Sequence, residues 1–161
     1  GSEVVAPVNF NAPGQVVIAG HTAAVQRAIA ACKDKGAKRA LPLPVSAPFH
    51  TSLMKPAGEQ LARDLATIRI SAPQVPVVHN VHARTEQDPE RIRELLVQQI
   101  HSPVKWTQSV RFVIEQKITM VLEVGPGKVL GGLCKRIDGG IECHACEDPE
   151  EMQKSLAAAA A

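Results

Sequence analysis

The sequence has very few aromatic side chains. Of its 161 residues, three are phenylalanine, one is tryptophan and none is tyrosine, so aromatic residues make up 2%. Apolar residues still make up 45%, so a core has to be built mainly from valine, leucine, isoleucine and alanine. A chain of this length and composition is long enough to bury the core of one globular domain.

The sequence also lacks a marked excess of charge of either sign. There are 18 Lys and Arg residues against 16 Asp and Glu, and the net charge is +2. A nucleic-acid site needs clustered basic residues, and a membrane-surface helix needs a basic amphipathic face. Neither pattern occurs, so we expect no nucleic-acid partner and no membrane partner. No apolar run approaches the roughly 20 residues of a membrane span and no secretion signal opens the chain, which predicts a cytoplasmic protein.

The four cysteines do not form a metal-binding pattern. Cys143 and Cys146 have the spacing of half a zinc knuckle, but a structural zinc site needs four ligands and no second pair with this spacing occurs. His79 and His82 fall in a predicted strand, where residues three apart point to opposite faces and cannot share one ion. We therefore expect reduced thiols and no metal site.

Strand and helix patterns alternate along the chain. Apolar runs around a Pro-Gly turn predict a hairpin over residues 4–18, and Asp88 followed by Pro89 is a strong helix start signal. Helices are predicted at 22–36, 53–68, 88–100, 106–116, after Gly127 and in the alanine-rich tail, and further strands at 37–46, 74–80 and 119–124. This alternation predicts an α/β (α+β) architecture.

The stretch VSAPFHTSLM, residues 45–54, places Phe49 directly before His50 in a predicted loop. The residues alone leave two interpretations open, a loop histidine held by structural hydrogen bonds or a general base. Histidine changes charge near neutral pH, which suits a base that takes a proton from a hydroxyl or thiol. Such a base needs a nucleophile within reach and a third group that fixes its tautomer.

A second stretch, VLEVGPGKVLGGL at residues 121–133, combines a strand, a glycine-rich turn and a helix start. These are the elements of a phosphate-binding loop. The Walker pattern is absent, however, so a tight strand-to-helix turn is the favoured interpretation.

Four segments together resemble one enzyme family. VNFNAPGQVVIAG, GAKRALPLPVSAPFHTSLMKPA, SPVKW and EVGPGKVLGGLCKRI are similar, in order over residues 3–137, to malonyl-CoA:acyl carrier protein transacylases of bacterial fatty-acid synthesis. The similarity is to the C-terminal half of the family. It implies the C-terminal part of the acyltransferase fold, a mostly parallel sheet with helices. Residues 1–45 would form an incomplete ferredoxin-like small subdomain, and residues 46–161 part of the large α/β hydrolase-like subdomain.

The resemblance implies an acyltransferase with a Ser–His dyad. His50 would be its general base, oriented by the backbone carbonyl of Gln99. Phe49 would wall the acyl pocket and favour malonyl over branched malonates, and Asn11 would lie near the substrate entrance. The substrates would be malonyl-CoA and the phosphopantetheine thiol of acyl carrier protein, and no cofactor is expected.

The family's nucleophilic serine has no counterpart in this sequence. No G-x-S-x-G elbow occurs, and neither does the family's GQGSQ loop. We therefore expect part of a longer enzyme, inactive alone and dependent on a missing N-terminal half. The alternative is a non-catalytic module that binds the acidic carrier protein through a basic face. That face would consist of Lys38, Arg39, Lys55, Lys128, Lys135 and Arg136.

Overall fold

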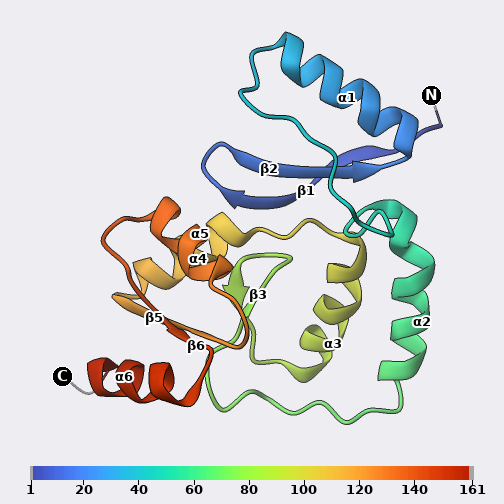
Figure 1. Ribbon diagram of the computed structural model, residues 1–161. Helices are drawn as coiled ribbons and strands as arrows, with labels where there is room; N and C mark the ends of the chain where they lie inside the picture. Colours follow the sequence, from blue (N-terminus) through green and yellow to red (C-terminus); the bar gives the residue numbers. More distant parts are fainter. Residues whose placement is uncertain (1, 160–161) are drawn as a thin grey trace.

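The computed structural model describes residues 2–159, in which a hairpin and one helix lie beside a larger group of helices and short strands (Figure 1). Residues 1, 160 and 161, which belong to the predicted subdomains and the predicted C-terminal helix, lie outside the described residues. The elements are β1 (Val5–Ala12), β2 (Gln15–Gly20), α1 (Thr22–Asp34), η1 (Ser52–Met54), α2 (Lys55–Leu65), β3 (Val78–His79), β4 (Arg84–Thr85), α3 (Pro89–Gln98), η2 (Gln99–His101), α4 (Trp106–Glu115), β5 (Met120–Val124), α5 (Val129–Ile137), β6 (Glu142–Cys146) and α6 (Pro149–Ala159). This mixture of helices and strands is the predicted α/β class.

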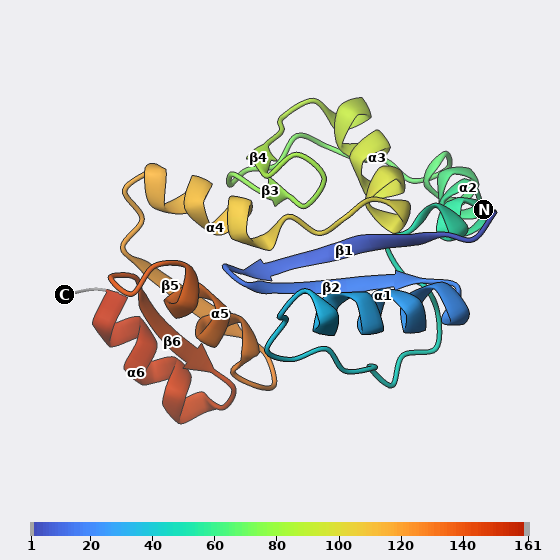
Figure 2. The ribbon, with the colours of Figure 1, turned by 90° about the horizontal axis from the view of Figure 1, so that it is seen from above.

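The predicted N-terminal hairpin is confirmed. β1 and β2 pair antiparallel from Val5 opposite Gly20 to Ala12 opposite Gln15. The turn between them uses Gly14 at a φ of +74°, a conformation that glycine adopts without steric cost. Figure 2 shows α1 lying along β2, while α3 and α4 lie on the β1 side. The hairpin thus separates α1 from the rest of the chain.

Backbone hydrogen bonds tie the hairpin to the segment between η2 and α4. The N–H of Phe10 donates to the carbonyl of Val104 at 3.0 Å, and the N–H of Val104 donates to the carbonyl of Val8 at 2.8 Å. The Thr107 hydroxyl adds a hydrogen bond of 2.9 Å to the carbonyl of Phe10. The two parts of the chain therefore share a short parallel bridge at residue 104.

The C-terminal part is built on the parallel pair β5 and β6. Val110 of α4, Cys134 of α5 and Ile141 form its buried core. Among residues 2–159, no strand pairs with the other edge of β5. Leu122 is 38% exposed and Val124 is 79% exposed, so the prediction that this run is covered on both faces does not hold within the described residues.

The helical half of the fold is carried by α2 and α3, which lie side by side (Figure 1). α3 begins as predicted, because the Asp88 carboxylate accepts a hydrogen bond of 2.9 Å from the N–H of Glu90 and Pro89 occupies the first turn. The longest helix, α1, has 13 residues. Nowhere in residues 2–159 does a helix combine the length and apolar character needed to cross a bilayer.

Several predicted elements are wrong. Residues 37–46 form an extended loop without strand pairing, since Pro42 and Pro44 offer no N–H to a ladder. The strand expected at 74–80 shrinks to β3, and β6 was not predicted. Because β3 ends at His79, the following turn brings the His79 and His82 rings to a centroid distance of 5.9 Å, so the opposite-face argument is also wrong. Within the described range, no three His, Cys, Asp or Glu side chains are grouped to hold a metal ion.

Two glycines provide a matched test of this backbone. A Cβ at Gly20 (φ +155°) would overlap the carbonyl oxygen of Val4, whereas a Cβ at Gly132 in α5 would meet nothing within 4 Å. We expect Gly20→Ala to lower the free energy of unfolding by about 1–3 kcal/mol or more. Gly132→Ala is expected to raise it by about 0.5–1 kcal/mol, because alanine is the better helix former. Urea unfolding followed by circular dichroism measures both, and equal midpoints for the two variants would contradict the described path at Gly20.

Candidate active site

The predicted base lies in a tight turn that leads into η1. His50 has a φ of +62°, the left-handed conformation that residues with side chains adopt rarely. Such a conformation costs about 1–3 kcal/mol and persists only where neighbouring contacts fix the backbone. Here Thr51, which is 2% exposed, donates its hydroxyl to the carbonyl of Pro48 at 2.7 Å and accepts from the N–H of Leu53 at 3.3 Å.

The His50 ring contacts the backbone of Gln99. Its Nδ1 lies 2.8 Å from the Gln99 carbonyl oxygen. A carbonyl can only accept, so Nδ1 carries the proton and the neutral ring presents Nε2 as an acceptor. Gln99 lies at the junction of α3 and η2. A carbonyl oxygen has two lone pairs, so the Gln99 carbonyl can accept the imidazole N–H at this position.

Close packing holds η2 in place beneath this contact. α2 contacts η2 at Gly58, where an added Cβ would lie only 3.1 Å from Cδ2 of His101. On the other side, Nδ2 of Asn80 lies 3.5 Å from Oε1 of Gln99, a long contact at the limit of a hydrogen bond. Asn80 was not predicted as a site residue, because the HNVH segment suggested only a metal motif.

The structure brings together three of the four predicted site residues. Phe49 precedes His50 in the same turn and is 47% exposed. Asn11 lies elsewhere, at the end of β1 beside the hairpin turn. Its neighbours along the chain contact α4 and α5, since Phe10 accepts from Thr107 and Gln15 accepts from Arg136.

Within the described residues, no partner nucleophile lies beside the predicted base. Across residues 2–159 no hydroxyl or thiol is hydrogen-bonded to the His50 ring. Cys134 offers no activated substitute, since burial, with a smaller effect of the Cys143 thiol, raises the pKa of Cys134 to about 11. Burial also raises the pKa of Cys143. A thiol with a raised pKa is mostly protonated at neutral pH and is a poor nucleophile.

An apolar pocket of about 280 Å³ opens between α4, β5 and α5. It includes Asn80, which connects it to the side chain of Gln99. Two buried polar atoms on its wall, Nε1 of Trp106 and Oγ of Ser109, have no hydrogen-bond partner within residues 2–159. Buried donors and acceptors are normally paired, so these two atoms lack the partners that a complete protein interior would supply.

One wall of the pocket is a carboxylate that caps α5. Glu123 accepts from the N–H of Gly131 at 2.7 Å and from that of Leu130 at 2.9 Å. These backbone hydrogen bonds hold the pKa of the Glu123 carboxyl below its usual value. The glycine-rich turn at 125–127 is therefore followed by a helix whose N-terminal amides are already occupied by the protein itself, which disfavours the phosphate-loop interpretation.

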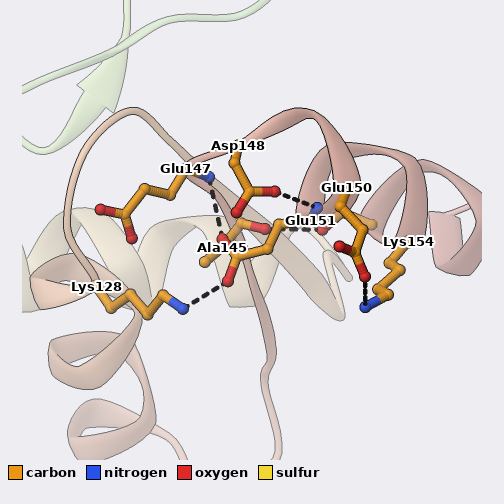
Figure 3. A network of polar contacts seen from close by, with 8 residues as sticks. Lys128, Ala145, Glu147, Asp148, Glu150, Glu151 and Lys154 are labelled. Atoms are coloured by element: carbon orange, nitrogen blue, oxygen red, sulfur yellow. Dashed lines mark hydrogen bonds and ion pairs between the residues drawn. The ribbon is translucent and has the colours of Figure 1, made fainter.

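Lys128, which follows the glycine-rich turn, forms an ion pair within the protein (Figure 3). Lys128 Nζ lies 2.6 Å from Oε1 of Glu151 in α6, and this contact raises the pKa of the lysine and lowers that of the carboxyl. Glu151 is held in turn, because its second oxygen accepts from the N–H of Glu147 at 3.2 Å and its N–H donates to Asp148 at 2.8 Å. The predicted basic face thus loses the free charge of Lys128, while Lys38, Arg39, Lys55, Lys135 and Arg136 are exposed.

Comparisons with known proteins agree on one family. The family model described as "Acyl transferase domain" matches residues 2–136. "Malonyl CoA-acyl carrier protein transacylase" of Salmonella typhimurium is 56% identical over 154 residues, which cover 96% of this chain and 50% of the relative. The protein of the same name from Bacillus subtilis is 42% identical over 148 residues, covering 92% and 47%.

Solved structures give the same result. The acyl-carrier-protein S-malonyltransferase of Burkholderia pseudomallei 1710b superposes with a TM-score of 0.94 at 48% identity, covering 97% of this chain and 51% of that one. A malonyl-transacylase in complex with its type II PKS acyl-carrier protein superposes with a TM-score of 0.94 at 51% identity, covering 97% and 50%. The chain thus spans about half the length of the curated relatives it matches.

Proposed function

Because the chain belongs to the acyl transferase domain family, we propose that it supplies the C-terminal half of a malonyl-CoA:acyl carrier protein transacylase of bacterial fatty-acid synthesis. The observation that carries this proposal is the 2.8 Å contact between His50 Nδ1 and the Gln99 carbonyl oxygen. It provides an oriented neutral imidazole of the kind that general-base catalysis requires. We keep the division into residues 1–45 and 46–161 as part of the proposal.

In the proposed reaction, Nε2 of His50 takes the proton of a serine hydroxyl supplied by the N-terminal half. The serine oxygen attacks the malonyl thioester, the C–S bond breaks, and the imidazolium returns its proton to the sulfur of CoA. His50 then takes the proton of the phosphopantetheine thiol, and the sulfur attacks the malonyl-serine ester. The serine leaves with the proton from the ring, and no cofactor enters either half-reaction.

The open part of the structure supports an interface with the missing half. β5, whose other edge is unpaired within residues 2–159, lines the apolar pocket together with Trp106 and Ser109, whose buried polar atoms have no partner in that range. A strand or helix seated there would bury apolar surface and offer partners to both polar atoms. Because Asn80 joins this pocket to Gln99, such a segment would approach the His50 turn.

Two further residues keep their proposed roles. Phe49, next to the base, is proposed as the wall that favours malonyl over branched malonates, a discrimination of about 1–3 kcal/mol per methyl group. Asn11 is proposed near the entrance used by the substrates, acyl carrier protein included. A cytoplasmic location accompanies the proposed activity.

The direct test is a transfer assay on the full-length enzyme that contains this chain. With malonyl-CoA and acyl carrier protein bearing phosphopantetheine, we expect malonyl carrier protein and free CoA in equal amounts. Carrier protein without the prosthetic group is the control and should remain unmodified, because it lacks the accepting thiol. Salt-sensitive binding of the carrier protein without any transfer would contradict the enzyme and favour the non-catalytic module.

A further inference from the structure

The turn that carries His50 is closed by a side chain that the proposed reaction does not use. Thr51 is buried to 2% exposure although it lies between the exposed Phe49 and the exposed Ser52. Its hydroxyl makes two hydrogen bonds, one to the carbonyl of Pro48 and one from the N–H of Leu53. The hydroxyl therefore donates to the backbone before the Phe49–His50 pair and accepts from the backbone after it.

These hydrogen bonds explain how the strained backbone of His50 is held in place. His50 adopts its left-handed backbone (φ +62°) inside the loop that the Thr51 hydroxyl closes. Thr51 also caps η1, whose residues pack against η2, the element that carries the Gln99 carbonyl. The same side chain thus fixes the backbone of His50 and the packing of its turn against the group that orients the ring.

We propose that Thr51 is a positioning residue, whose buried hydroxyl holds His50 in the left-handed turn so that Nδ1 faces Gln99 and Nε2 faces the substrate. The inference rests on the proposed function for its catalytic consequence. A relaxed turn would move the imidazole away from the carbonyl, and a displacement of about 1 Å in such a group can cost about 10²-fold in rate.

The test compares two variants in the full-length enzyme. Thr51→Val keeps the shape and removes the hydroxyl, whereas Thr51→Ser keeps the hydroxyl and removes the methyl group. We expect Thr51→Val to slow malonyl transfer by about 10²-fold and Thr51→Ser to keep most of the rate. Nitrogen NMR of ¹⁵N-histidine-labelled enzyme should show the Nδ1-protonated tautomer of His50 in the wild type and in Thr51→Ser, and a mixture of tautomers in Thr51→Val.

The outcomes separate positioning from packing. If Thr51→Val keeps the wild-type rate and tautomer, or if both variants slow transfer equally with the tautomer unchanged, Thr51 has only a packing role and the inference is overturned. Should the valine variant not fold, Thr51→Ala takes its place beside Thr51→Ser, since both lack the methyl group. If the wild-type enzyme transfers no malonyl, the proposed function fails, while the tautomer comparison still decides the role of Thr51.

Discussion

Replacing His50 by alanine in the full-length enzyme is expected to slow malonyl transfer by about 10²–10⁴-fold, the range that a positioned general base contributes. The alanine cannot take the proton of the serine or of the carrier-protein thiol. The fold should persist, because the ring is only partly buried and makes a single hydrogen bond, to Gln99. Alanine and histidine both carry a Cβ and meet similar strain at a left-handed position, so little change in the urea midpoint is expected.

The matched control is His144→Ala. His144 lies in β6, and its Nε2 contacts the Glu142 carboxylate at 2.6 Å, remote in sequence and in fold from the His50 turn. Transfer is measured as the initial rate of malonyl carrier protein formation, and mass spectrometry of the enzyme detects the malonyl-serine intermediate. If His50→Ala forms the intermediate as fast as the wild type, or if His144→Ala is equally slow, the assignment of the base is wrong.

The second large effect concerns the 161-residue chain on its own. It is expected to transfer no malonyl above the solvent background, because it contains the proposed base without a G-x-S-x-G nucleophile. In a serine hydrolase, loss of the nucleophile alone lowers kcat by about 10⁶-fold. Addition of the separately produced N-terminal half is expected to restore transfer, and a chain carrying His50→Ala should fail to restore it.

The same experiment has a physical readout besides activity. The edge of β5 that no strand of residues 2–159 pairs, and exposed apolar residues such as Val124 and Val129, 79% and 69% exposed, predict self-association of the isolated chain. Light scattering should fall when the N-terminal half is added. Transfer by the isolated chain at the rate of the full enzyme would contradict the claim that this chain lacks a nucleophile. It would also contradict the proposed division of the catalytic site between two halves of the enzyme.

The sequence predicts the elements whose signals are local. The hairpin over 4–18 and the start of α3 at Asp88 both follow from turn and capping residues, and both are present. The strand expected at 37–46 fails because apolar residues between prolines cannot complete a ladder. β6 escapes prediction because its sequence, ECHAC, is short and mixes polar and apolar residues. Its pairing with β5 comes from the tertiary structure.

The candidate site shows the same division between local and tertiary information. His50 stands out in the sequence through its proline-flanked loop, but its contact with a residue 49 positions away was expected only from the family resemblance. Thr51 and Asn80 gave no signal. The hydrogen bonds of Thr51 depend on a left-handed turn, and the contact of Asn80 depends on the end of β3, neither of which can be derived from residue types.

The bridge at Val104 has a mechanical consequence. Four residues of chain lie between it and Gln99, whose carbonyl contacts the imidazole, and β1 holds it with two backbone hydrogen bonds, one to Val8 and one from Phe10. Movement of the hairpin and α1 would therefore displace the segment that follows Gln99 as well as the loop that precedes Phe49. Movement of the hairpin and displacement of the Gln99 carbonyl would then be coupled.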